Sequence, residues 1–213
     1  SKKKAMEHFA RAGYREMGED GVLKNERGER LVVELTFADS STLMTNVCSI
    51  LRQEALKCGV DLRLDPLTYN VCSRKVFEKR YQAALWAWPL QTPFPRLYET
   101  FASELAYDAR GNPVGNTNNI FAVADTELDA ALDAERNAPD GAALKKALHR
   151  AQKRIHELCV WIPGWREPYT YVACWRWIRW PESPTRFCSP RIYNPLESHL
   201  YWVDEKMKKE TQE

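Results

Sequence analysis

A chain of 213 residues with 44% apolar and 28% charged residues has an ordinary globular composition and is long enough to bury a sizeable core. Its net charge is only +2 and its lysines and arginines are scattered, so neither a nucleic-acid-binding stripe nor an acidic solvating tail is indicated. No apolar run in the sequence approaches the roughly 20 residues that cross a bilayer.

The first segment, SKKKAMEHFARAGY, is amphipathic and lacks the apolar stretch of a signal peptide. Ala5, Phe9 and Ala12 recur at helical spacing, and Gly13 predicts the end of that helix. Because the sequence begins inside a helix, we expect it to be a piece of a longer protein. The following polar stretch, MGEDGVLKNERGER, contains three glycines and predicts a loop that folds as a hairpin.

The next residues alternate between strand and helix patterns. RLVVELTFAD (30–39) and VDLRLDPL (60–67) alternate in the manner of strands. The segment between them (40–59) begins with Ser/Thr capping residues and ends at a glycine, as a helix does. A second helix is predicted over 70–80, followed by a third strand, YQAALWAW (81–88). Strands joined by helices of this length pair in parallel, so we predict an α/β fold: an open, mainly parallel sheet with helices on both faces.

The third predicted strand is unusual because it ends in tryptophans and a proline, YQAALWAWPLQTPFP. Its nearly continuous apolar character predicts a strand in the middle of the sheet, covered on both faces. Ligands of open α/β sheets gather beyond the carboxyl ends of the strands. Trp86, Trp88 and Pro89 stand at that end of this strand, which makes them candidates for the wall of a binding site.

The second half of the chain predicts a loop, two helices and a hairpin. Residues 94–121 show weak periodicity and several asparagines. A helix is predicted over 125–138 with Asp125 as its N-cap, and another over 141–158 with an apolar stripe. Residues 159–180 predict a strand, a Pro/Gly turn and a second strand, and a last strand is predicted at HLYWVD. The stripe on the second helix consists of Leu144, Leu148, Ala151 and Ile155.

The six cysteines show neither a CxxC motif nor Cys/His spacing suited to zinc, so we expect no metal or redox cofactor. Two interpretations of them stay open: small buried hydrophobes, or pairs formed in an oxidising compartment. In the second case Cys159 and Cys174, on neighbouring strands of the predicted hairpin, are the pair to test. The sequence also lacks a GxSxG elbow and a glycine-rich phosphate loop, so we expect no catalytic residues.

The order of several short motifs resembles a known family. A helix ending in AGY is followed by GVLKN, ELTF, YQAALWAW, DTELDAAL, AQKRIHEL and IPGWREPYTYVACWR. This order resembles the carboxyl-terminal part of the periplasmic peptide-binding proteins of ABC importers (extracellular solute-binding family 5). WREPYTYVACWRW and LYWVDEKMKK are most similar to the branch that serves microcin C and oligopeptide uptake.

The resemblance implies a fold and an organisation. The fold would be a lobe of the type II periplasmic-binding-protein kind. Residues 1–24 would belong to the hinge and first lobe, 25–175 would form the second lobe, and 176–213 would return to the first lobe. The missing amino-terminal part would hold the signal peptide and most of the first lobe.

The resemblance also implies a function. The protein would be a periplasmic monomer that captures a peptide or modified peptide and delivers it to the transmembrane subunits of an ABC permease, with no cofactor, metal or nucleic acid. A ligand-sensing accessory protein of the same fold is the alternative, and a hydrolase is a more distant one.

The site residues follow from the same resemblance. Trp88 matches a tryptophan that relatives carry at this strand end, and Trp86 lies on the same strand face by alternation. Gln91 stands where many relatives place an aspartate that binds the peptide amino terminus. Because Gln91 has no charge, recognition of a free amino terminus by this residue is not expected, which agrees with the modified or atypical peptides that the branch resemblance implies. Further candidates on the loops behind the strand are Thr92, Arg96 and Asn118.

Structural roles compete with these assignments. The two tryptophans would also serve to cap the sheet, Gln91 to fill a solvated turn, and the asparagines at 116, 118 and 119 to form turns. His149 and His156 are expected to be solvated. Core and hinge packing is expected of Trp161, Trp165, Tyr169 and Tyr171.

Overall fold

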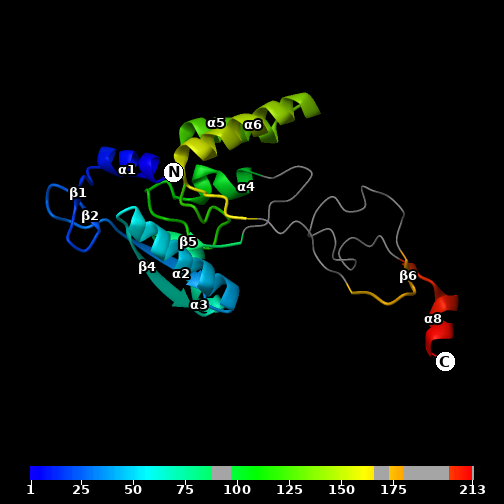
Figure 1. Ribbon diagram of the computed structural model, residues 1–213. Coiled ribbons are helices and arrows are strands. Elements are labelled where there is room, and N and C mark those ends of the chain that lie inside the picture. Colours follow the sequence, from blue (N-terminus) through cyan, green and yellow to red (C-terminus); the bar gives the residue numbers. More distant parts are fainter. Residues whose placement is uncertain (88–96, 166–172, 180–201, 213) are drawn as a thin grey trace.

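A three-stranded parallel sheet forms the centre of the first half of the chain (Figure 1). The computed structural model describes residues 1–87, 97–165, 173–179 and 202–212. In it, β3 (Val32–Ala38) lies between β4 (Asp61–Leu67) and β5 (Ala83–Leu85), and Leu35 of β3 is paired with Leu64 on one side and Ala83 on the other. The predicted α/β class and parallel pairing are therefore confirmed.

The expectation that residues 81–88 form the middle strand is wrong for the described part of the sheet. There β3 is central, and β5 pairs with β3 alone through three residues. The strand ends at Leu85, and the next residue, Trp86, packs its ring against helix α3 (Tyr69–Phe77). The apolar character of the segment thus reflects packing on a helix as well as pairing in a sheet.

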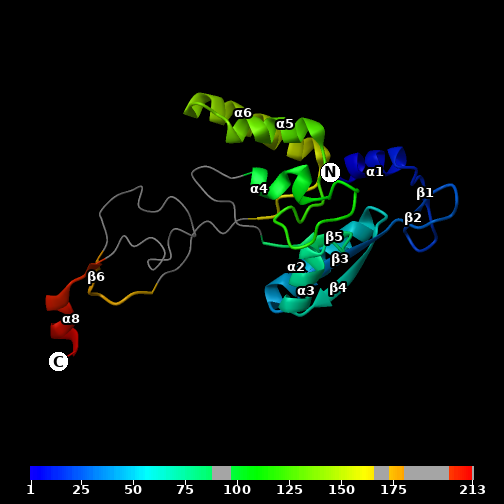
Figure 2. The ribbon, with the colours of Figure 1, turned by 180° about the vertical axis from the view of Figure 1, so that it is seen from behind.

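Helices cover both faces of the sheet, as predicted (Figure 2). On one face, Leu35 and Phe37 pack against Cys48 of α2 (Thr42–Lys57). On the other, Ala84 packs in a second cluster with Cys72 and Val76 of α3. This alternation follows from the pleat of a strand, which sends successive side chains to opposite faces.

A polar network fastens α3 to the sheet. Thr36 is completely buried, and its hydroxyl donates a hydrogen bond of 2.9 Å to Asp65 Oδ2. Lys75 Nζ of α3 donates to the same oxygen at 2.7 Å and to Glu34 Oε1 at 2.6 Å. The ammonium of Lys75 holds the pKa of Asp65 below its usual value. The buried hydroxyl of Thr36 thus has a hydrogen-bond partner.

The hairpin near the amino terminus lies against the end of α2. Helix α1 (Lys2–Arg11) is followed by the predicted hairpin, formed by β1 (Glu16–Met17) and β2 (Leu23–Lys24). Gly59 ends α2 with φ +82°, and its carbonyl accepts a hydrogen bond of 2.8 Å from the amide of Leu23. A residue without Cβ is needed there because the Leu23 side chain lies directly over the glycine.

The two helices predicted in the second half of the chain are present, and two short helical segments lie in the stretch that was predicted as a loop. This half contains α4 (Tyr98–Phe101), a short 3-10 turn (Ser103–Leu105), α5 (Thr126–Arg136) and α6 (Gly141–Leu158). Asp125 and Asp140 cap α5 and α6, accepting hydrogen bonds from the amides of Leu128 at 2.8 Å and Ala143 at 2.7 Å. The core of this half contains the predicted α6 stripe together with residues of α4 and α5: Leu97, Phe101, Leu128, Leu132, Leu148, Ala151 and Ile155, with Leu144 partly buried.

Residues 119–123 connect the two halves. The buried Asn119 side chain donates to the carbonyls of Ala102 at 2.9 Å and Val123 at 3.0 Å, and accepts from the amide of Val123. The Tyr81 hydroxyl, just before β5, donates to the carbonyl of Ile120. Phe121 packs against both the helical core and the core between the sheet and α3. This short segment therefore belongs to both cores.

The carboxyl-terminal elements differ from the predicted hairpin over 159–180. The last predicted strand is present as β7 (Trp202–Val203), which pairs antiparallel with β6 (Ile178–Arg179) and precedes α8 (Glu205–Gln212). Residues 159–165 form no strand. Cys159 ends α6 with φ +53°, and Trp161 packs its ring on Phe101 and Phe121, so this stretch covers the helical core instead of pairing. Cys159 and Cys174 are exposed free thiols.

Among the helices of the described segments, none combines the length and the apolar character that crossing a membrane requires.

Candidate ligand-binding edge of the sheet

The carboxyl ends of the three strands define one edge of the sheet. Because the strands are parallel, Ala38, Leu67 and Leu85 end at the same side. Helices α2 and α3 begin at that side, after β3 and β4. Trp86 follows directly after β5. The edge therefore collects two helix amino termini and a tryptophan, the arrangement in which open α/β sheets place ligands.

Trp86 lies between two aromatic rings of α3. Its ring stacks on Tyr69 with centroids 5.9 Å apart and planes 16° from parallel, and meets Phe77 edge-on at 6.2 Å. Trp86 is half-buried, whereas Tyr69 is 59% exposed. The Trp86 ring is thus fixed by contacts with Phe77 and Tyr69, and the exposed Tyr69 ring continues the aromatic surface toward solvent. Both capping the sheet and presenting an aromatic surface are compatible with this geometry.

Tyr69 is the residue of this edge that the sequence pattern missed. The predicted helix began at residue 70, whereas α3 begins at Tyr69, immediately after the N-cap Thr68. A usable signal was present: an aromatic residue two positions beyond the end of the predicted strand 60–67 has to lie near the carboxyl edge.

The first turns of α2 and α3 leave backbone donors at the same edge. Their N-cap residues, Ser41 and Thr68, make no side-chain capping hydrogen bond, and neither helix has an acidic residue in its first turn. By contrast, α5 and α6 do have Asp caps. Uncapped amides at a helix start carry partial positive charge and can donate to carbonyl or carboxylate oxygens.

Of the other predicted site residues, only Asn118 lies among the residues that the structure describes. Trp88, Gln91, Thr92 and Arg96 lie outside the described residues. Asn118 is exposed and lies in a loop held by the end of α3: the Asn116 amide donates to the carbonyl of Phe77, and Lys79 donates to the hydroxyl of Thr117 at 3.0 Å. The structure thus brings Trp86 together with Tyr69 and Phe77, and the loop of Asn118 together with Lys79.

Several structural roles are confirmed. Asn119 is buried and fully bonded, and Asn116 adopts a left-handed turn conformation with φ +58°. Trp161 packs against the helical core, as expected, whereas Trp165 is 51% exposed, so core packing is not confirmed for it. His149 and His156 are exposed on α6, as expected. Tyr169 and Tyr171 lie outside the described residues.

The described cysteines behave as individual thiols. Cys48 and Cys72 are buried, and burial raises the pKa of both. Cys58, Cys159 and Cys174 are also free. Within the described ranges, no three His, Cys, Asp or Glu side chains are grouped so that they could hold a metal ion.

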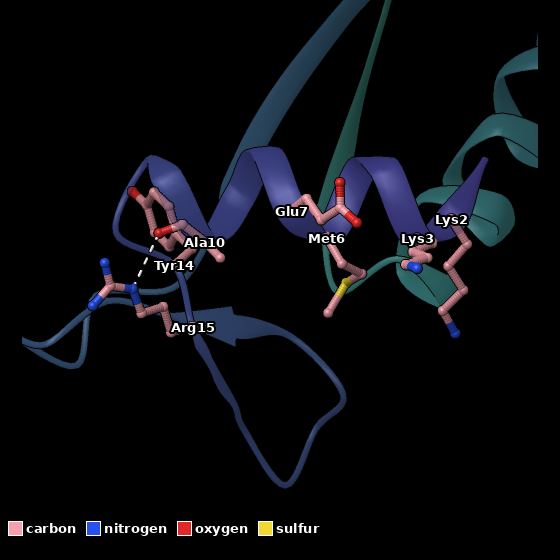
Figure 3. A pocket seen from close by; sticks show the side chains of 7 residues that line it. All are labelled: Lys2, Lys3, Met6, Glu7, Ala10, Tyr14 and Arg15. Carbon is pink, nitrogen blue, oxygen red and sulfur yellow. Dashed lines mark hydrogen bonds between the residues drawn. The ribbon is translucent and has the colours of Figure 1, made fainter.

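A surface hollow lies along α1, away from the predicted site residues in sequence (Figure 3). Met6, Ala10 and Tyr14 are its apolar lining residues. Lys2 and Lys3 lie at one end, Arg15 lies at the other, and the acidic Glu7 lies between them. Arg15 Nε donates to the carbonyl of Ala10 at 3.1 Å, which fixes that side of the hollow. It contains none of the residues of the carboxyl edge.

Comparison with known proteins places this fold. No protein-family model and no curated protein sequence matches the chain. Among solved structures, it is similar to the oligopeptide-binding protein AppA from Bacillus subtilis in complex with a nonapeptide, with a TM-score of 0.68 and 17% identity over 95% of this chain and 37% of that one. It is also similar to NikZ from Campylobacter jejuni in complex with Ni(L-His), with a TM-score of 0.61 and 22% identity over 75% of this chain and 31% of that one.

A third similar structure is the oligopeptide-binding protein from Thermus thermophilus complexed with a pentapeptide. Here the TM-score is 0.60, with 18% identity over 73% of this chain and 28% of the other. The chain therefore spans about a third of the length of these similar solved structures. The likeness confirms the predicted fold, an α/β lobe of the periplasmic-binding-protein type II kind.

Proposed function

We propose that this chain is part of the solute-binding component of an ABC importer, which captures peptides or modified peptides and delivers them to a membrane permease. The observation that supports this most directly is the aromatic pair of Trp86 and exposed Tyr69 at the carboxyl edge of a parallel sheet. The fold supports it too, because structures of this fold are named as binding oligopeptides. The protein would act by binding, without catalysis.

The proposed mechanism combines an aromatic surface with backbone hydrogen bonds. Tyr69 and Trp86 offer a flat apolar face to a side chain of the ligand. The uncapped amides of α2 and α3 would donate to ligand carbonyl or carboxylate oxygens. An extended peptide that also bonds through its main chain is held without strict selection of side chains, as in strand addition. Trp88, Gln91, Thr92, Arg96 and Asn118 are proposed to complete the site.

The organisation proposed for the longer protein follows the same scheme. Residues 25–175 would form the second lobe, with 1–24 and 176–213 in the hinge and first lobe. The protein would be a periplasmic monomer and, by its late motifs, a member of the microcin C branch. Peptides retained by the full-length protein from a random pentapeptide library, identified by mass spectrometry, test the proposal; retention of none of them contradicts it.

Replacing Tyr69 with alanine is expected to weaken peptide binding by about 1–3 kcal/mol, the usual effect of removing an aromatic contact. Thermal stability should change little because the ring is mostly exposed. Trp88→Ala is expected to act in the same way. Calorimetry with the tightest retained pentapeptide measures both. Leu56→Ala is the control, because Leu56 is an exposed apolar residue in the last turn of α2, at the end of that helix away from the carboxyl edge of the sheet. Equal affinities for Tyr69→Ala and Leu56→Ala would remove Tyr69 from the site.

Gln91→Asp is expected to shift preference toward peptides with a free amino terminus. A carboxylate pairs with the terminal ammonium, whereas the amide of Gln91 carries no charge. Titrating free and amino-acetylated forms of one pentapeptide against wild type and variant measures the shift. If the ratio of the two affinities is unchanged, this position does not face the ligand terminus.

A further inference from the structure

The outer face of α6 is strongly basic. Figures 1 and 2 show α5 and α6 side by side, on the side of α4 away from the sheet. On α6, Leu148, Ala151 and Ile155 face the helical core, and the exposed residues between them fall on the opposite side of the helix. Glu157 is the only acidic residue of this helix. The exposed cations, here called the basic face, are Lys145, Lys146, Arg150 and Lys153.

The basic face has little anionic charge to pair with. Lys153 Nζ lies 3.8 Å from Glu157 Oε1, but the lysine side chain is 79% exposed, so solvent weakens this pair. Among the described residues, no carboxylate lies within ion-pair distance of Lys145, Lys146 or Arg150. These cations are therefore available to an anionic surface outside the fold.

Most acidic side chains of the neighbouring helix α5 are engaged within the fold. Those of Asp125 and Glu127 pair with Arg154, at 2.7 Å and 3.5 Å. Those of Asp129 and Glu135 accept hydrogen bonds from backbone amides at the start of the 3-10 turn and of α4. The α5 carboxylates consequently do little to neutralise the basic face.

Clustering on one side distinguishes α6 from α1, which is also basic. Lys2, Lys3 and Lys4 of α1 are consecutive, so their side chains point roughly 100° apart around the helix. The cations of α6 recur three and four residues apart, a spacing that keeps them on one side. Of the two helices, α6 is thus the one that presents its cations together to a flat surface.

Exposed apolar side chains follow the basic helix. Ile162 is 84% exposed and Trp165 is 51% exposed, whereas Trp161 packs its ring on Phe101. Bilayer surfaces attract this combination, because lysine and arginine meet lipid phosphates while tryptophan and apolar side chains enter the headgroup region. A nucleic acid would use the cations but would leave Ile162 without a contact. The combination therefore favours a lipid surface as the partner.

We propose that the basic face of α6 holds the protein against a bilayer that contains anionic phospholipid. The inference rests on the proposed function, because a binding component that delivers its ligand to a membrane permease has to approach the bilayer. Attraction between the basic face and lipid phosphates is electrostatic, so it should decline as salt shortens the range of the charges. Peptide binding should not depend on the basic face.

The test measures how much full-length protein sediments with vesicles of phosphatidylcholine alone and of phosphatidylcholine mixed with phosphatidylglycerol. Wild type should sediment with the mixed vesicles at low salt and be released at high salt. A triple variant, Lys145→Gln with Lys146→Gln and Arg150→Gln, should bind the mixed vesicles roughly ten- to hundredfold more weakly. The matched control is the triple variant Lys2→Gln, Lys3→Gln and Lys4→Gln, which loses the same charge on α1 and should bind as wild type does.

Three results would overturn the inference: wild type that does not sediment with the mixed vesicles, equal binding to both kinds of vesicle, or equal losses in the two triple variants. An α6 variant that loses binding to duplex DNA but keeps vesicle binding overturns it in favour of a nucleic acid. Both triple variants should melt with wild type, because the replaced side chains are exposed. Retention of pentapeptides, measured separately on the same proteins, reports on the proposed function alone.

Discussion

Gly59→Ala is expected to lower the free energy of unfolding by about 2–4 kcal/mol, combining the strain of a left-handed residue with overpacking. Gly59 has φ +82°, and a Cβ atom there would lie 2.6 Å from Cγ of Leu23. Leu23 is only 1% exposed and its amide is bonded to the Gly59 carbonyl, so it has little freedom to move away. Urea unfolding followed by circular dichroism measures the loss.

Gly28→Ala separates the two causes. Gly28 has φ +77°, but a Cβ atom there would meet open space. This variant should lose only the conformational part, about 1–2 kcal/mol. If Gly59→Ala is no less stable than Gly28→Ala, the end of α2 and the β1–β2 hairpin are in looser contact than the position of Leu23 over Gly59 indicates.

Asp125→Ala is expected to destabilise the helical half by about 2–3 kcal/mol, because one side chain serves both as a helix cap and as an ion-pair partner. Its Oδ1 accepts from the Leu128 amide at 2.8 Å and from Arg154 Nε at 2.9 Å, and Oδ2 accepts from Arg154 Nη2 at 2.7 Å. The carboxylate is only 16% exposed, so solvent screens this pair weakly. Denaturant unfolding measures the difference from wild type.

The same residue makes stability depend on pH. The bond with Arg154 is the largest of the causes that lower the pKa of Asp125, from 3.8 to about 2. A lowered folded-state pKa contributes stability above pH 3.8, and this contribution is lost as the pH falls toward 2. The gap between wild type and Asp125→Ala should therefore close over that range. Asp140→Ala, which removes a cap on α6, should cost only about 1 kcal/mol; equal losses for the two variants would show that the Arg154 pair contributes nothing.

The elements that the sequence predicted correctly are those defined by local signals. The strand 30–39, the helix 40–59 and the strand 60–67 each have clear periodicity and a capping or glycine residue at a boundary, and the structure places β3, α2 and β4 there. Asp125 likewise predicted both the start of α5 and the capping bond. These signals act within one turn or one strand, so they can be read without knowing the tertiary contacts.

The errors concern aromatic stretches, where local pattern does not identify the partner. YQAALWAW was expected in the middle of the sheet, but in the described strand order β4-β3-β5 its strand pairs with β3 alone. The first strand of the 159–180 hairpin was expected from its aromatic and β-branched residues, but Trp161 packs on Phe101 and Phe121. An aromatic residue is compatible with pairing in a sheet and with covering a helix, and only the tertiary fold decides between them.

The candidate site was predicted in part for the same reason. Trp86 could be placed because the carboxyl ends of parallel strands share an edge. Tyr69 was not, because the predicted helix began at residue 70, whereas α3 begins at Tyr69.

The segment 119–123 has a consequence for how the molecule opens. Phe121 is shared by both cores, and Asn119 bonds to residues on either side of it in the helical half. Detaching α5 and α6 from the sheet would expose Phe121 and break the hydrogen bond between Tyr81 and Ile120. The free energy lost by exposing this apolar surface would exceed the small gain in chain entropy, so partial opening is disfavoured. Amide protons in β3 and in α5 should consequently exchange with solvent through one common opening, and the two halves should behave as a single cooperative unit.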